Sequence, residues 1–166
     1  QKQTAEAERY VTEAQRIIAT SGAKATALGF GVQLAVCQVA LATLAATTEA
    51  ACEQAQQIAT EVYGASSTQS ATAQIQLAQY FIGTKQSAKA LPLAQAAILA
   101  TGESEQIGQR FYAQTLVAVA LFNSGAKAEA RRYALDVIGP MRSHQDLNAK
   151  QSVAMLEGLL VAINAR

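Results

Sequence analysis

A spacing of 40 residues recurs along this chain. Written in blocks that begin at Gly31, Ala71 and Phe111, the sequence places similar side chains in the same columns. The columns contain Glu49-Ala50, Lys89-Ala90 and Glu129-Ala130; Ile58, Ile98 and Ile138; Leu41, Phe81 and Leu121; and Cys37, Leu77 and Val117. A fixed period of this size is typical of repeat proteins, in which neighbouring units stack to build a shared core.

Each block divides into two helical segments. Helices are favoured because alanine, the best helix former, is the largest contributor to the apolar share of 51%, and proline occurs only at Pro92 and Pro140. In the second block we expect a helix over 71–82 and another from Ser87, separated by Gly83-Thr84, with the Pro92 ring facing outward. In the third block we expect helices over 111–123 and 127–138, the latter ended by Gly139-Pro140.

The ends of the chain fit the same scheme. Helical patterns cover 6–20 and 152–165, which makes about eight antiparallel helices in one all-α domain over 1–166. We assign a partial leading repeat to 1–22, repeats to 31–70, 71–110 and 111–150, and a closing helix to 151–166. A single hairpin cannot bury its apolar face alone, so stacking of neighbours must create the core.

The second and third blocks carry the clearest motif. Leu77-Ala78-Gln79-Tyr80-Phe81 precedes Lys85, Lys89-Ala90-Leu91-Pro92-Leu93 and Ala97; the next copy has Val117-Ala118, Leu121, Gly125, Glu129-Ala130, Tyr133, Ala134 and Val137. Over about residues 75–144 this pattern resembles tetratricopeptide repeats (TPRs), with a spacing more similar to the kinesin-light-chain or MalT type. The resemblance implies a right-handed superhelix, or α-solenoid, and a role in binding other proteins.

Small residues have a physical role in this pattern. Ala78 and Ala118 let the first helix of a hairpin approach the second, and Ala90 and Ala130 do the same from the other side. The first block departs from the pattern, because Gln38 stands where the small residue belongs. Either its register is shifted by one residue or its geometry is irregular.

Charge and motifs exclude several classes of function. The net charge of +1 is spread without blocks, which argues against a nucleic-acid partner. The uncharged run from Ala25 to Thr48 contains glutamines, threonines and glycines, so we expect a buried helix and no membrane span. His144, in an expected solvated loop, is the only histidine and completes no catalytic or metal-binding set, so we expect neither enzymatic activity nor a cofactor or metal.

Three further expectations concern context. The chain begins with Gln1 and not with methionine, so we expect either a processed product or a part of a larger protein. Its many alanines and glutamines favour a bacterial source. The compartment is left open, with the bacterial cytoplasm slightly favoured over the periplasm.

Two cysteines are too few for a disulfide scaffold, so we expect Cys37 and Cys52 to be buried thiols, with a bridge across one hairpin as the alternative.

By resemblance, the first helix of each pair lines a concave groove. Its predicted lining is apolar and neutral and lacks the basic set that clamps a terminal carboxylate, so an apolar peptide or helix is the expected partner. Ligand sensing by a regulatory domain of a transcription or signalling protein is the alternative, and self-association is a third. The predicted partner-binding residues are Ile75, Gln79, Ile82, Tyr112, Thr115, Val119, Phe122 and Asn123, and the lining also includes Ala35, Val39, Ala42 and Thr72.

Overall fold

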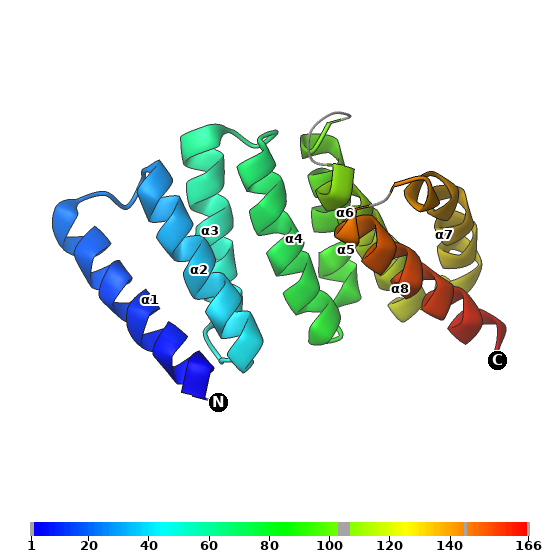
Figure 1. The fold of residues 1–166 in the computed structure, drawn as a ribbon, viewed down its shortest axis with the longest axis horizontal. Helices are drawn as coiled ribbons and strands as arrows, with labels where there is room; N and C mark the ends of the chain where they lie inside the picture. Colours follow the sequence, from blue (N-terminus) through cyan, green and yellow to red (C-terminus); the bar gives the residue numbers. More distant parts are fainter. Residues whose placement is uncertain (1, 103–106, 145, 166) are drawn as a thin grey trace.

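The computed structural model describes residues 2–102, 107–144 and 146–165, and in this part of the chain it is all-helical. The helices stand in a row, with α1 at one end and α7 and α8 at the other (Figure 1). They are α1 (Lys2–Ser21), α2 (Ala27–Thr43), α3 (Thr48–Tyr63), α4 (Thr68–Gly83), α5 (Ser87–Ala100), α6 (Ile107–Asn123), α7 (Lys127–Arg142) and α8 (Leu147–Asn164).

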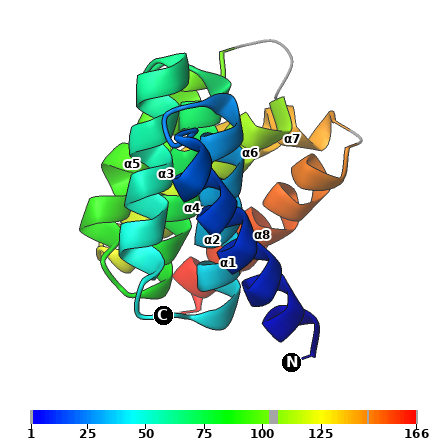
Figure 2. The same ribbon diagram turned by 90° about the vertical axis from the view of Figure 1, so that its left-hand side faces the viewer.

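Contacts between helices follow a regular order. Each helix packs against the next one in the chain, which forms the hairpins α2–α3, α4–α5 and α6–α7. In addition, the first helices of successive hairpins contact one another, α2 with α4 and α4 with α6, and α6 contacts α8. Within the described residues, no such contact joins α3 to α5 or α5 to α7. Seen from the end at α1, α3 and α5 lie on one side and α8 on the other (Figure 2). We call the side formed by α2, α4, α6 and α8 the first-helix face.

The turn inside each hairpin repeats the same backbone geometry. An N–H donates across the end of the first helix to a carbonyl five residues earlier, and the residue before that N–H has a positive φ. The bonds are Ala45 to Ala40 (3.0 Å), Gln86 to Phe81 (2.7 Å) and Ala126 to Leu121 (3.0 Å), after Leu44 (φ 53°), Lys85 (φ 62°) and Gly125 (φ 86°).

The first hairpin is shifted against the other two. Its turn spans the four residues 44–47, whereas 84–86 and 124–126 have three residues each. Matching the turns pairs Cys37, and not Gln38, with the fully buried Ala78 and Ala118. In the second helices it pairs the buried Ala51, and not the exposed Ala50, with Ala90 and Ala130. The strict 40-residue alignment therefore misplaces the first block by one residue in each helix.

Alanine occupies two buried columns in the second helices. Ala55, Ala94 and Ala134 are all 0% exposed, and each lies one turn after the alanine of the preceding column, Ala51, Ala90 or Ala130. Residues four apart share one face of a helix, so each second helix presents a strip without long side chains to its partner. The core that results is continuous: one buried cluster runs from Phe30 in α2 to Ala130 in α7, and a second joins α6, α7 and α8.

Several predicted boundaries differ from the structure. Helices α1, α4 and α6 begin at Lys2, Thr68 and Ile107, three or four residues before the predicted starts. Gly139-Pro140 does not end α7, which continues to Arg142. Pro140 and Asp136 are exposed, so the carbonyl that loses its partner at position 136 faces solvent. The closing helix begins at Leu147 and not near 151, because the Asp146 carboxylate caps it by accepting a hydrogen bond from the Ala149 N–H (2.9 Å).

Two further expectations concern α5, and both are confirmed. Helix α5 begins at Ser87, and Pro92 lies in it with an exposed side chain. His144 lies between α7 and α8, outside both helices, as expected, but it is half-buried rather than fully solvated, with its ring 5.0 Å from that of Phe111. In the described part of the chain, no helix combines the length and the apolar character needed to cross a membrane.

The alanine strip predicts a sharp contrast between neighbouring positions. Ala90→Leu should lower the free energy of unfolding by about 1–3 kcal/mol, because the larger side chain has no space between α4 and α5. Ala88→Leu, two residues earlier on the exposed side of α5, is the matched control and should have little effect. Urea unfolding measures both, and equal stabilities for the two variants would contradict the packing described.

Candidate functional site

A pocket of about 640 Å³ lies between α2 and α4 on the first-helix face. It is open to solvent, and its lining is apolar with several uncharged polar groups. We call it the α2–α4 pocket. Its lining residues are Gln38, Leu41, Ala42, Leu44, Ala45, Ala46, Thr48, Gln76, Gln79, Tyr80, Gly83 and Thr84.

Leu44 breaks two local rules at the edge of this pocket. Its side chain is 89% exposed, and its backbone is left-handed, a conformation that costs a residue with a Cβ about 1–2 kcal/mol. The equivalent positions in the other hairpins hold Lys85 and Gly125. Lysine is better suited than leucine to exposure to solvent, and glycine adopts a positive φ without a steric cost. An exposed leucine held in a costly conformation beside an apolar pocket makes this edge a candidate contact surface.

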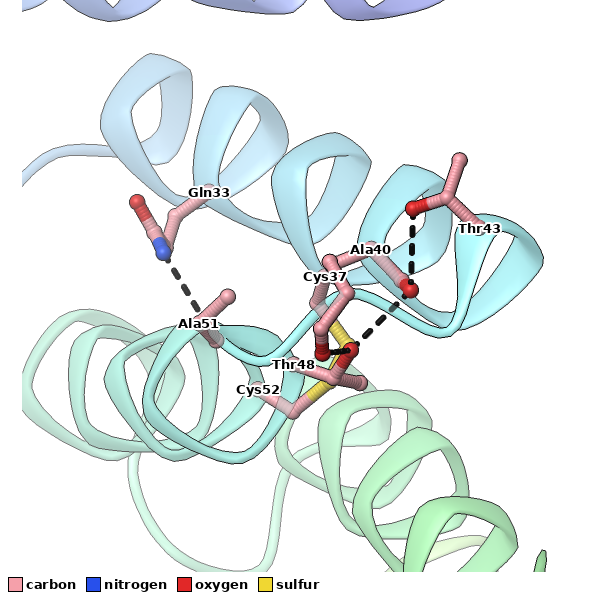
Figure 3. The surroundings of a disulfide bond; sticks show 8 residues. Gln33, Cys37, Ala40, Thr43, Thr48, Ala51 and Cys52 are labelled. Atoms are coloured by element: carbon pink, nitrogen blue, oxygen red, sulfur yellow. Dashed lines mark hydrogen bonds between the residues drawn. A yellow bond between two sulfur atoms is a disulfide. The ribbon is translucent and has the colours of Figure 1, made fainter. Parts of the chain in front are cut away.

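The wall of the pocket formed by α2 and α3 is braced by a disulfide (Figure 3). Cys37 and Cys52 are bridged and both are 0% exposed, so the expectation of two free thiols is wrong. Thr48 Oγ1 lies 2.6 Å from the Ala45 carbonyl oxygen and 3.0 Å from that of Ala40. Gln33 Nε2 donates to the carbonyl of Ala51 (3.0 Å). These links fix the turn that carries Leu44.

The opposite wall is held by Tyr80 on α4. Its hydroxyl donates to Glu49 of α3 (3.3 Å), and Lys89 of α5 pairs with the same carboxylate (3.2 Å). Desolvation, and then the Glu49 carboxylate, raise the pKa of Tyr80, so the phenol stays neutral at physiological pH. The two hairpins that flank the pocket are therefore joined by a polar contact in addition to their apolar packing.

Two smaller pockets continue the surface towards α8. The α4–α6 pocket, of about 190 Å³, shares Gln76 and Gln79 with the α2–α4 pocket. Its lining residues are Thr72, Ile75, Gln76, Gln79, Gly108, Gln109, Tyr112 and Asn148. The α6–α8 pocket shares Tyr112 and Asn148 with it and adds Gln151, Ala154 and Met155. None of the described residues that line the three pockets is charged.

A close approach of α6 and α8 joins these smaller pockets. A Cβ added at Gly108 would lie 3.0 Å from Asn148 Nδ2, so the glycine allows the first turns of the two helices to meet. On α4, Gln79 Nε2 donates to the hydroxyl of Tyr112 on α6 at 2.5 Å. Burial raises the pKa of Tyr112, which keeps its hydroxyl protonated.

The structure divides the eight predicted partner-binding residues. Gln79 and Tyr112 line the pockets and touch one another. Ile75 is 5% exposed at the base of the α4–α6 pocket, and Thr115 is 0% exposed, with its hydroxyl bonded to the Phe111 carbonyl, so both belong to the core. The other four lie outside these three pockets: Ile82 and Phe122 pack on the core, Val119 is half-buried, and Asn123 is exposed at the end of α6.

Sequence reasoning missed much of the α2–α4 pocket. It included Ala42 but not Leu44, because a turn residue with an exposed apolar side chain carries no repeat signal. It treated Gln38 as a departure from the motif, whereas this side chain is exposed and lines the pocket.

Comparison of the chain with protein-family models, curated proteins and solved structures found no match. Among the described residues, no group of three or more histidine, cysteine, aspartate or glutamate side chains is placed to hold a metal ion.

The disulfide should stabilise the first hairpin strongly. Replacing both cysteines by alanine should lower the free energy of unfolding by about 3 kcal/mol, the effect expected for the sequence separation of 15 residues. Alanine is the suitable replacement because Cys37 occupies the column of Ala78 and Ala118. Urea unfolding of the oxidised protein, the reduced protein and the double variant makes the comparison. Alkylation of both thiols in the denatured but unreduced protein would contradict the bridge.

Proposed function

We propose that this chain is a non-catalytic protein-interaction module of the tetratricopeptide-repeat type. In this proposal its hairpins form a right-handed α-solenoid, and an uncharged, apolar segment of a partner protein lies against the first-helix face. The observation that carries the proposal is Leu44, exposed and left-handed at the edge of the largest pocket described. An apolar side chain from a partner would bury this leucine together with Leu41, Ala45 and Tyr80.

The packing of the hairpins supports a curved array. First helices of neighbouring hairpins contact one another, while in the described chain α3, α5 and α7 do not. A row whose units touch more closely on one side bends towards that side, which would make the first-helix face the concave one. The three adjoining pockets on this face support a continuous binding surface rather than an isolated cavity.

Charge limits the kind of partner. The uncharged lining offers no counter-ion, so a charged side chain entering the pockets would lose its hydration without compensation. A partner segment with apolar and small polar side chains is therefore favoured. The alternative of a small-molecule sensor stays a prediction, and no feature of the described pockets favours it over a peptide.

A selection experiment tests the proposal. Short random segments displayed on phage are selected on the immobilised chain, and the affinity of the best segment is then measured for variants. Leu44→Asp should weaken binding at least about tenfold, because it places a charge at the edge of the apolar pocket. Aspartate tolerates the left-handed backbone better than leucine, so this variant should remain as stable as the wild type.

Leu99→Asp is the matched control. Leu99 is 83% exposed on α5, away from the first-helix face, and its replacement should leave the affinity unchanged. Failure to select any segment, or an equal loss of affinity in the Leu44 and Leu99 variants, would overturn the proposal.

A further inference from the structure

Side-chain amides line the whole length of the first-helix face. Each of the three adjoining pockets contains several, and they come from four different helices. We call this set the amide row. It consists of Gln38 on α2, Gln76 and Gln79 on α4, Gln109 on α6, and Asn148 and Gln151 on α8.

Much of the amide row is accessible to solvent and keeps hydrogen-bonding groups that the described contacts within the fold do not occupy. Gln38, Asn148 and Gln151 are exposed, and Gln76 is half-buried. Gln79 donates one hydrogen bond to Tyr112, and that bond leaves its carbonyl oxygen and the Tyr112 hydroxyl proton uncommitted. In contrast, Gln33 on the same α2 helix is buried inside the hairpin, where it donates a hydrogen bond to the Ala51 carbonyl.

One member of the row has an unsatisfied acceptor. Gln109 Nε2 donates to Thr72 Oγ1 at 3.1 Å, while its Oε1 is buried without a partner among the described residues. A buried acceptor without a donor costs free energy, so it marks a place where a ligand donor would be favourable.

We infer that the first-helix face binds an extended, uncharged peptide segment through its backbone. This inference rests on the proposed function and specifies the conformation of the partner. A carboxamide carries the same donor and acceptor as a peptide group, so it can pair with both the N–H and the C=O of an extended chain. A helix already pairs these groups internally and would leave most of the amide row without a use.

The α2–α4 pocket sets the register of the segment. One apolar side chain of the segment enters between Leu41, Leu44 and Tyr80, and the backbone then continues past Gln76 and Gln79 towards Gln109 and Asn148. Specificity for side chains is concentrated at the first pocket, while the amides hold any uncharged sequence that can lie extended. Charged residues are excluded along the row because no described residue that lines it is charged.

The test uses the best segment from the phage selection as a synthetic peptide. In a series of analogues, one backbone amide at a time is replaced by an ester, which removes the N–H donor with little change in shape. We expect at least one ester next to the apolar anchor residue to weaken binding about tenfold. The double variant Gln76→Leu/Gln109→Leu should bind the parent peptide about tenfold more weakly, whereas Gln95→Leu, on the exposed side of α5, should stay within about twofold.

Circular dichroism of the complex reports the conformation of the bound peptide. A gain of helical signal on binding, or an ester series and a double variant that all bind within about twofold of the parent, would overturn the inference. In either case, continued sensitivity of the same peptide to Leu44→Asp would leave the proposed function standing. The ester series uses unaltered protein, so it decides the question even where the double variant fails to fold.

Discussion

The close contact of helices at alanine positions is the constraint on which the rest of this structure depends. Ala55, Ala94 and Ala134 are completely buried at equivalent points of α3, α5 and α7. Such contacts let helix axes approach closely, but they bury little area each, so stability has to come from many of them. This explains why the buried cluster extends from α2 to α7, and why a chain with only 5% aromatic residues can form it.

The first hairpin meets the same constraint by a different means. Cys37 takes the place of the alanine found at positions 78 and 118, and it is bonded to Cys52 across the contact. The hairpin also has a turn one residue longer than its neighbours, and Leu44 lies in that turn. The covalent link therefore holds the least regular unit of the fold in place, and this unit provides one wall of the largest pocket described. The hairpin with the irregular turn is therefore also the one that forms part of the candidate site.

The second and third hairpins could be predicted from the sequence, because their apolar period, the Ser87 start and the Gly125 turn all agree with one another. The first hairpin could not be aligned, because an extra turn residue displaces its two helices in opposite directions relative to a fixed period. Leu44 could not be identified, since neither a left-handed backbone nor exposure is visible in a single leucine. The amide row was hidden for a related reason: glutamines are common in this chain, and only the packing shows that Gln33 is buried whereas Gln38 lines a pocket.

Heteronuclear NMR of side-chain amides shows most directly whether the amide row contacts a bound peptide. Each glutamine and asparagine gives its own side-chain signals, so the contact surface can be read residue by residue as the selected peptide is added. The account predicts that the signals of Gln38, Gln76, Gln79, Gln109, Asn148 and Gln151 shift, while those of Gln57 on α3 and Gln95 on α5 do not. Shifts concentrated on α3 and α5, with the amide row unchanged, would contradict it.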